Sequence, residues 1–490
     1  MKYILAVDIG TTSAKALVVS QSGEVLASAQ EFYPTHHPQP DIAEQDPEEV
    51  FHAVKKIIKL ASGKINVKIE ALSFSSAMHS LMAVNAEGAA LTPIITWADL
   101  RSKKEAQEIN KEGGQSIYEE TGTPIHPMTP LCKLRWIRKN QPALLATAFK
   151  FIGIKEFIWF KFFHEFVVDH SVASATGLFH TENKAWSAKA LNAAGISDEK
   201  LSKPCSALTI FRNPDISLCK ELGIPESVSW IIGASDGCLA NLGSGAMDEG
   251  TLSLTIGTSG AVRKTVKKNS PDTLGRTFHY HLDDETLVTG GATNNGAILV
   301  QWFAENILKE KVDVKYFGER ASAVVAGSEG LIFVPYLLGE RAPVFDSDAT
   351  GVFFGIRQLH SQEHFMRALL EGVGFALRSI AEIVEENSGG YDKVVASGGF
   401  IKSPHWVQII SDIFGKEFIV RGTEDASALG ASLIGFKAMG IATDFKFSKE
   451  RAYHPDLDIH KKYSQYFSVY KNLYPHLSAD FQLLKQITNP

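Results

Sequence analysis

Residues 8–15 read DIGTTSAK, and this stretch decides the fold. It lies between two short apolar runs, residues 3–7 and residues 16–19, and a Ser-Gly turn at residues 22–23 leads into a third run at residues 25–32. Short runs rich in β-branched residues between turn residues are typical of strands. The pattern therefore predicts that the chain opens with consecutive β-strands, as a meander, and not with a strand, a loop and a helix.

The turn within this stretch can bind an anion. A glycine turn lets backbone N–H groups approach a phosphate closely, hydroxyl side chains add donors, and a lysine adds a point charge. The candidate phosphate-binding residues are Gly10, Thr11, Thr12, Ser13 and Lys15. Asp8, at the end of the first predicted strand, can hold Mg²⁺ through water. Gly and Thr are also common in ordinary hairpin turns, so the turn alone leaves both interpretations open. No P-loop motif occurs, and no dinucleotide-binding fingerprint follows the first strand.

A weak internal repeat supports the phosphate interpretation. Residues 254–261 read LTIGTSGA and resemble residues 7–14, VDIGTTSA, and each copy lies between two strand-like runs. Repeated units predict two similar halves, whose turns at Gly10 and Gly257 would hold one nucleotide from both sides. We place the boundary in the glycine-rich stretch near residue 246, which gives domains 1–246 and 247–490. The first would bind the substrate and carry the first phosphate turn, and the second would bind the nucleotide and end in a helical tail.

Composition narrows the class of protein. The net charge of -6 argues against a dedicated nucleic-acid binder, which usually carries a basic excess. The four cysteines form no C-x-x-C pair, which fits a reducing cytoplasm, and Met1 leads directly into a strand without a signal-peptide pattern. Residues 151–166 are rich in Phe, but charged residues interrupt them and a membrane span needs about 20 apolar residues. We therefore expect a buried helix there and no membrane association.

Two further loops have the composition of functional sites. Residues 231–237, IIGASDG, place Asp236 after an apolar strand, where a carboxylate can accept a hydroxyl proton as that oxygen attacks phosphorus. The alternative is an aspartate that caps the next helix. Residues 396–400, ASGGF, place Gly398 and Gly399 where the backbone can press against a base or ribose, although a simple strand-to-helix turn explains them equally.

Several polar and aromatic residues in the first half follow predicted strand ends. Such a mixture can bind a polyhydroxylated ligand, because carboxylates and imidazoles take hydroxyl groups and aromatic walls cover C–H faces. The candidates are Met78, His79, Trp97, Asp99, Arg101 and His126. A single His or Trp is more often a packed core residue, so the prediction depends on the group as a whole.

Together these features resemble the FGGY family of carbohydrate kinases over nearly the whole chain. The segments that carry the resemblance are residues 128–137, 169–174, 335–343 and 351–372. The first contains Lys133 and Trp136 at the fixed positions of the family's first signature. The last resembles the second signature and departs from it at Leu369, where we expect an effect on packing and not on activity.

The resemblance implies a fold, cofactors and residue roles. The fold is the two-lobed α/β fold of actin and Hsp70 ATPases (ribonuclease H-like), with duplicated mixed-sheet domains and a cleft between the lobes. The cofactors are ATP and Mg²⁺, and Asp236 corresponds to the catalytic base. The positions that match nucleotide-binding residues are Thr11, Thr12, Ser13, Lys15, Gly257, Thr258, Gly296, Gln301, Gly398, Gly399 and Ser403, and Asp8 matches the carboxylate near the metal. Family members are often homodimers, which is analogy only.

Within the family the chain is most similar to the branch that acts on gluconate, a sugar acid. The similarity lies in residues 73–80, residues 96–101 and residues 122–133; the xylulose branch more often has Gly-Gln-Met-His-Gly where this chain has Ser-Ala-Met-His-Ser at residues 76–80. A substrate carboxylate needs a cationic or N–H-rich partner. The candidates are His79, Arg101, His126 and Lys133. The alternatives are a kinase for xylulose or another polyol and, in a different class, a non-catalytic ATP-binding protein of the actin/Hsp70 type.

Overall fold

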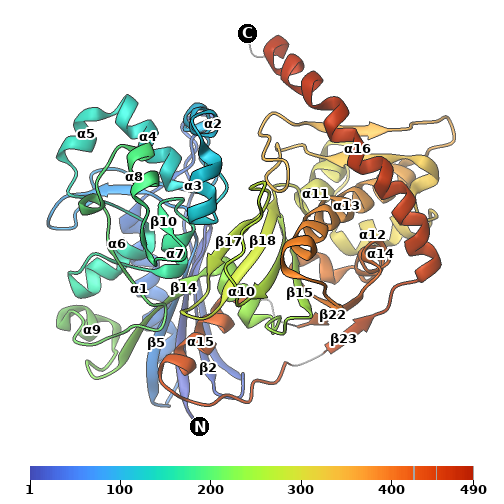
Figure 1. The fold of residues 1–490 in the computed structure, drawn as a ribbon. Coiled ribbons are helices and arrows are strands. Elements are labelled where there is room, and N and C mark those ends of the chain that lie inside the picture. The colour runs from blue at the N-terminus through green and yellow to red at the C-terminus, as the bar shows by residue number, and fades with distance from the viewer. Residues whose placement is uncertain (423–424, 448–449, 489–490) are drawn as a thin grey trace. The chain divides into compact units, whose positions relative to one another are not determined.

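The computed structural model describes residues 1–422, 425–447 and 450–488, which fall into two compact units (Figure 1). The first unit consists of Met1–Gly245, Val266–Val288 and Asp425–Lys446, and the second of Ala246–Thr265, Thr289–Glu424 and Phe447–Pro490. Two segments that follow the boundary predicted near residue 246 thus pack with the first unit.

The central sheet of the first unit begins with the predicted meander. Strands β1 (Tyr3–Ile9), β2 (Ser13–Ser20) and β3 (Val25–Phe32) pair antiparallel in sequence order. Strand β5 (Ile69–Ser76) lies parallel to β1, and β14 (Ser229–Ser235) lies parallel to β5. With β13 (Ile210–Phe211) at its edge, the sheet has the order β13-β14-β5-β1-β2-β3.

Helices cover both faces of this sheet, and β1 and β5 are therefore buried on both sides. Helix α1 (Pro47–Gly63), capped by Asp46, packs on β2 and β3. Helix α15 (Ala426–Ala438) packs on β1 and β5, where the Cα of Gly435 approaches Ile4 and Ser73. Alternate residues of a strand point to opposite faces. Asp8 has the parity of Ile4 and therefore shares the α15 side.

The other elements of the first unit are mostly helical. They are β4 (Glu44–Gln45), β6 (Met82–Val84), β7 (Ile94–Ile95), α2 (Lys103–Lys111), α3 (Gly114–Thr121), α4 (Pro130–Asn140), α5 (Pro142–Thr147), β8 (Lys150–Ile152), α6 (Ile154–Phe163), β9 (Val167–Asp169), α7 (His170–Ser174), β10 (Phe179–His180), β11 (Ala185–Trp186), α8 (Ala188–Ala194), η1 (Asp198–Lys200), β12 (Lys203–Cys205), α9 (Ile216–Leu222), α10 (Asp236–Gly243) and β17 (Phe278–His281).

The Phe-rich segment near residue 160 forms α6, and most of its side chains are buried in the core of the first unit. Within the residues that the structure describes, no helix has the length and apolar character that crossing a bilayer requires.

The second unit repeats the strand arrangement of the first. Strands β15 (Thr251–Ile256) and β16 (Gly260–Val266) form an antiparallel hairpin, and β21 (Lys393–Ser397) lies parallel to β15 as β5 does to β1. Strand β22 (Glu417–Arg421) continues in parallel, and β18 (Leu287–Thr293) follows β16 on the other side. The strand-turn-strand repeat seen in the sequence is therefore a repeat of the sheet itself.

The remaining elements of the second unit surround this sheet. They are α11 (Ile298–Phe303), η2 (Ala304–Leu308), α12 (Val314–Ser322), η3 (Ser328–Gly330), β19 (Ile332–Pro335), β20 (Gly351–Phe354), α13 (Gln362–Ser388), η4 (Gly399–Lys402), α14 (Pro404–Phe414), β23 (Glu450–Tyr453) and α16 (Leu457–Thr488). Helix α16 is the predicted tail, and it buries Tyr463, Phe467 and Tyr470 in the core of this unit.

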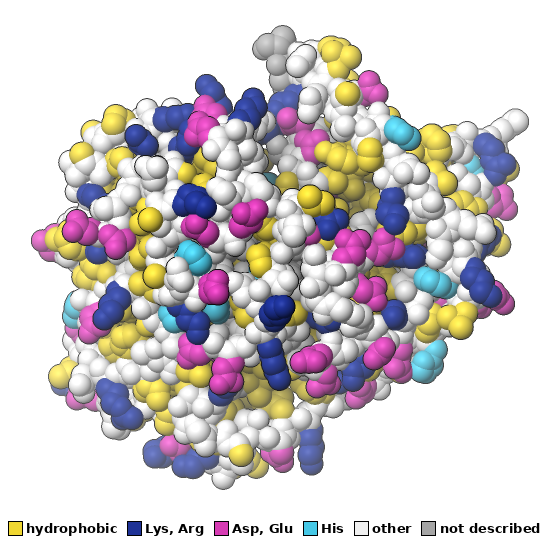
Figure 2. Space-filling model, viewed as in Figure 1, with side chains coloured by type: hydrophobic (Ala, Val, Ile, Leu, Met, Phe, Trp, Pro, Cys, Tyr) yellow, Lys and Arg dark blue, Asp and Glu magenta, His cyan; other side chains and the backbone are white. Residues whose placement is uncertain are grey.

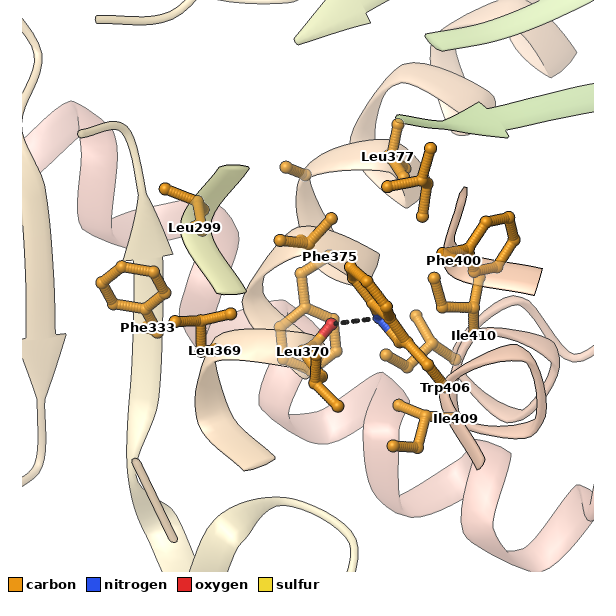
Figure 3. Packing of buried hydrophobic residues seen from close by; sticks show 14 of the residues in the cluster. Leu299, Phe333, Leu369, Leu370, Phe375, Leu377, Phe400, Trp406, Ile409 and Ile410 are labelled. Carbon is orange, nitrogen blue, oxygen red and sulfur yellow. Dashed lines mark hydrogen bonds between the residues drawn. The ribbon is translucent and has the colours of Figure 1, made fainter. Parts of the chain in front are cut away.

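The long helix α13 forms the centre of that core (Figure 3). Leu369, the departure from the second signature, is fully buried in it, as is Leu370, whose carbonyl accepts a hydrogen bond from Trp406 Nε1 at 3.4 Å. A packing role for Leu369 agrees with this position. On the face of the molecule in Figure 2, basic and acidic side chains are interspersed, so that face carries no continuous basic stripe.

Candidate active site

The turn between β1 and β2 is held by Tyr33, which the sequence did not single out, and by Trp97, which was predicted as a sugar contact. Gly10 N donates to Ser13 O at 3.0 Å, and the hydroxyl of Tyr33 donates to Gly10 O at 2.5 Å. Trp97 Nε1 donates to Thr11 Oγ1 at 2.8 Å. These hydrogen bonds to two carbonyl groups and one hydroxyl group hold the turn in place. Thr12 remains exposed.

Lys15 and Asp8 lie opposite each other in the β1–β2 register. Lys15 Nζ forms an ion pair with Asp425, a residue 410 positions away that directly precedes α15. Burial raises the pKa of Asp8, and the charge of Asp425 raises it further. Hydrogen bonding with the Ser75 side chain and the charge of Lys15 oppose this rise. Asp425 is a member of this charged group that sequence reasoning missed, because only the fold brings it near.

The surroundings of Asp8 fit a divalent cation. Its Oδ1 atom is inaccessible to solvent and has no hydrogen-bond partner among the described residues. A buried carboxylate oxygen without a partner is costly, and Mg²⁺ or a water bound to it would satisfy that oxygen. Asp8 is thus the residue through which this turn would help to hold Mg²⁺.

Asp236 is the first residue of α10, directly after β14. Gly233, with φ +69°, allows the strand to bulge there, since a Cβ at that position would lie 1.8 Å from Phe74 O. Below the loop, the buried Lys155 donates to Asp169 Oδ2 at 2.7 Å and to Ala234 O at 3.2 Å. Asp236 is half-buried and begins helix α10, on a loop that these hydrogen bonds hold in place. This position suits either a helix cap or a general base.

Two predicted sugar contacts lie beside the first phosphate turn. Met78 and Trp97 line a small pocket of about 10 Å³ together with Gly10, Thr11 and Tyr33. These residues come from four separate segments of the first unit. Their meeting at one point is what the prediction of a shared substrate and phosphate site requires.

Asp99 and Arg101 form a buried ion pair instead of standing open to a ligand. Arg101 donates to both oxygens of Asp99, at 2.8 Å and 2.7 Å, and to Glu44 at 2.5 Å. Ala43 N adds a bond to Asp99 Oδ2 at 2.8 Å. Because their groups are engaged within the protein, this geometry favours a supporting role, and direct contact with a substrate stays a prediction.

The two predicted histidines are both buried. His79 has φ 65°, and its Nδ1 is 2.7 Å from Ala175 O. His126 Nδ1 accepts a hydrogen bond from Met128 N at 3.2 Å. In each ring the Nδ1 atom is thus fixed by backbone, which orients the imidazole.

In the second unit the predicted nucleotide turn packs against the loop before α11. Gly296 N donates to Thr258 O at 3.1 Å, and Ala297 N donates to Gly257 O at 2.7 Å. A Cβ on Gly296 would lie 2.5 Å from Ser259 O, so only glycine permits this approach. Gly398 approaches Ile256 O in the same way, since its φ is +96° and a Cβ would lie 2.4 Å away.

A pocket of about 580 Å³ opens beside this turn, entirely within the second unit. It brings together three of the predicted nucleotide residues, Thr258, Gln301 and Gly399. The lining residues that sequence reasoning missed are Ala297, Ile298, Val300, Val312, Asp313, Val314, Lys315 and Lys402. Apolar walls with a few polar groups and a glycine are what a base and ribose need, and the volume lies within the usual range for ligand pockets.

Ser403 lies near this pocket but does not line it. Its side chain is fully buried and caps α14 through Trp406 N at 3.3 Å. It also lies against Gly318, where a Cβ would be 2.0 Å from its Oγ. This contact indicates a structural role, and a contact with adenosine stays a prediction.

The Gly-Glu-Arg segment, residues 339–341, supports the loop that contains Gly296, a predicted nucleotide contact. The buried Glu340 accepts hydrogen bonds from Thr293 Oγ1 at 2.6 Å and Asn294 N at 3.1 Å, so it fixes the end of β18 just before Gly296. Burial raises the pKa of Glu340 to about 7, while these hydrogen bonds, that of Arg341 N and the Arg341 charge oppose the rise.

The second signature also serves packing. Arg367 donates to Glu371 at 2.7 Å and to the hydroxyl of Tyr463 at 2.5 Å, and Glu371 accepts from Gly327 N at 2.9 Å. This buried network joins α13 to α16 and to the loop before η3.

Comparison with known proteins assigns both halves of the chain. The model of the FGGY family of carbohydrate kinases, N-terminal domain, matches residues 3–243, and that of the C-terminal domain matches residues 252–439. A gluconokinase of Bacillus subtilis (strain 168) is 40% identical over 90% of this chain and 89% of its own length. A xylulose kinase of the same organism is 26% identical over 97% of each chain.

Two solved structures share the fold. The gluconate kinase from Lactobacillus acidophilus has a TM-score of 0.94 at 33% identity and covers 99% of each chain. A ligand-bound xylulose kinase from the same organism has a TM-score of 0.94 at 33% identity and covers 99% of this chain and 100% of its own. The predicted two-domain α/β fold of the actin/Hsp70 type is confirmed, and the chain belongs to the FGGY family of carbohydrate kinases.

Proposed function

We propose that this protein is an ATP-dependent gluconate kinase, which converts D-gluconate and ATP to 6-phosphogluconate and ADP. The observation that carries the proposal is the 40% identity to a gluconokinase over 90% of the chain, against 26% for a xylulose kinase. The segments at residues 73–80, 96–101 and 122–133, which resemble those of the gluconate branch, are part of the same sequence similarity.

In the proposed reaction Asp236 is the general base. The terminal hydroxyl of gluconate loses its proton to the Asp236 carboxylate as its oxygen forms a bond to the γ-phosphorus of ATP. The bond from that phosphorus to the bridging oxygen breaks, and ADP leaves. Such transfers depend mainly on positioning and charge neutralisation, with modest help from the base.

The remaining groups would bind the two substrates. The second-unit pocket with Thr258, Gln301 and Gly399 supports binding of adenosine, and Gly10–Ser13 with Lys15 supports binding of phosphate. Mg²⁺, when bound near Asp8, neutralises charge on the phosphates. Met78, Trp97 and the imidazoles of His79 and His126 would contact the sugar acid.

The substrate carboxylate is the group that separates gluconate from xylulose. Arg101 is engaged by Asp99 and Glu44, and Lys133 donates to backbone carbonyls. His79 and His126 are therefore the better candidates among the four cationic or N–H-bearing side chains. A cytoplasmic location and a homodimeric state belong to the proposal by family analogy alone.

An ADP-release assay across sugars tests the proposal. We expect kcat/KM for gluconate to exceed that for D-xylulose, D-ribulose, glycerol and L-fuculose by at least about tenfold, since polar mismatches in a site are penalised strongly. Xylulose is the main alternative substrate, because one of the two similar Lactobacillus acidophilus structures is a xylulose kinase. A preference for xylulose over gluconate would contradict the gluconate assignment. ATP binding without any sugar-dependent ADP release would defeat the kinase assignment as a whole.

A further inference from the structure

Lys133, the lysine of the first signature segment, is completely buried on α4. Its Nζ atom donates to three backbone carbonyls: His79 O at 2.5 Å, Thr96 O at 2.8 Å and Ile95 O at 3.4 Å. An ammonium group has three donors, so these carbonyls use its whole capacity. Burying an ammonium is costly, and an apolar side chain of similar length would fill the space without that cost. The lysine therefore needs a reason other than filling volume.

The carbonyls belong to the two loops that carry predicted sugar contacts. One loop follows β5 and contains Met78 and His79, whose φ of 65° is uncommon for a residue other than glycine. The other follows β7 and leads from Thr96 into Trp97. Since a backbone at positive φ must be held by its surroundings, the bond from Lys133 to His79 O fixes the loop at its most strained point.

The same turn of α4 also holds the third predicted segment. Thr129, the N-cap of α4, donates to His126 O through its backbone N at 3.0 Å and through its Oγ1 at 2.9 Å. The start of this one helix thus fastens the segments of His79, Trp97 and His126 to one another.

The charge of Lys133 is compensated only from a distance. Burial lowers the pKa of Lys133 to about 7. The charge of Arg101 lowers this pKa further, while electrostatic interactions with Asp99 and Cys132 oppose the decrease. Asp99 itself is bound to Arg101, and among the residues that the structure describes no carboxylate is hydrogen-bonded to the Lys133 ammonium group. A lysine whose donors all point to backbone carbonyls is not disposed to receive a substrate carboxylate.

We propose that Lys133 is a positioning residue of the sugar site, which acts by tying the loop of His79 to the loop of Trp97 and does not touch the substrate. This inference rests on the proposed roles of Met78, His79 and Trp97 as sugar contacts. It gives the signature lysine a function in sugar affinity that is separate from nucleotide binding and from the base.

The test compares two buried lysines with the same chemistry. Lys264, in the second unit, is 2% exposed and donates to three backbone carbonyls, of Ser388, Gly389 and Gly390, at the end of α13. K133M and K264M each remove three bonds to backbone carbonyls, although the carbonyls of Gly389 and Gly390 lie in exposed residues. KM and kcat for the sugar that the wild type turns over best, Kd for ATP by equilibrium titration, and Tm are measured for both.

We expect K133M to raise KM for the sugar by about 10-fold to 100-fold, the range known for lost supporting partners of metal ligands, and to change Kd for ATP by much less. K264M should lower Tm without moving KM. K133Q, which keeps two N–H donors on a shorter chain, should fall between wild type and K133M. An unchanged sugar KM in folded K133M, or equal losses for sugar and ATP, would overturn the proposal. So would failure of both Lys133 variants to fold while K264M folds, because the lysine would then serve the fold alone.

The wild-type assay separates this inference from the substrate proposal. If the wild type prefers a sugar other than gluconate, the gluconate assignment fails, and the comparison of K133M with K264M still stands for the preferred sugar.

Discussion

Replacing Gly296 with alanine tests the nucleotide side of the site. The added Cβ would lie 2.5 Å from Ser259 O and 2.6 Å from Gly257 O, about 1 Å inside an ordinary contact. The loop before α11 must then move away from the turn. That movement breaks or weakens the bonds of Gly296 N and Ala297 N, at 3.1 Å and 2.7 Å, and that of Ile298 N at 3.4 Å.

The expected size follows from those bonds. Two or three hydrogen bonds at about 1 kcal/mol each amount to roughly 2–3 kcal/mol. If the loss falls on nucleotide binding, Kd for ATP rises roughly 30-fold to 150-fold, because about 1.4 kcal/mol is a factor of ten. KM for the sugar should change little, since the predicted sugar contacts lie in the first unit.

The assay is equilibrium titration of ATP together with sugar kinetics, at a temperature well below the Tm of the variant. Gly390→Ala is the matched control, because a Cβ there meets only Glu385 Oε1, at an ordinary 3.5 Å. Less than a threefold change in Kd for ATP in a folded G296A protein would refute the reasoning.

Three further changes test the other groups. Asp236→Asn should lower kcat by about 10²-fold to 10⁴-fold with Kd for ATP unchanged, as measured by ADP release, and near-normal turnover would remove Asp236 as the base. Lys15→Met should raise Kd for ATP about tenfold or more. In a double-mutant cycle with Asp425→Asn, the effects on Kd for ATP should be non-additive, since the two side chains form one ion pair. Additive effects would show that this ion pair does not influence phosphate binding. Glu340 has a pKa raised by burial to about 7, so its contribution to stability is complete below its unfolded pKa and is lost as pH rises through 7. Urea unfolding should show that this component of the pH dependence disappears in Glu340→Gln, and an identical pH profile in the variant would contradict it.

The strand framework could be predicted because its signals are local. The turn at Gly10 and its repeat at Gly257 each lie between apolar runs, and strand pairing across a short turn follows from such a pattern. Asp236 could be placed after a strand for the same reason. The sequence did not indicate which residues the charged site side chains pair with. Lys15 pairs with Asp425, 410 residues later, and no periodicity links the two.

Residue type alone also could not separate contact from support. Asp99 and Arg101 have the chemistry of sugar ligands, yet they bind each other, and Ser403 caps a helix. A charged side chain can contact a ligand directly or hold the backbone that forms the site. Residue type does not distinguish these two roles in a sequence. They differ in where the donors point, which only the packed structure determines.

This distinction matters most for substrate choice. Because Arg101 and Lys133 are both engaged in internal bonds, the donors that we propose to meet a gluconate carboxylate are imidazole and backbone N–H groups. Hydrogen bonds from such donors are directional, so the placement of the donors decides which sugar they fit. The loops that Lys133 fastens would then set the sugar preference. Two kinases with one fold could differ in substrate through the placement of the His79 and Trp97 segments, without exchanging a single charged residue.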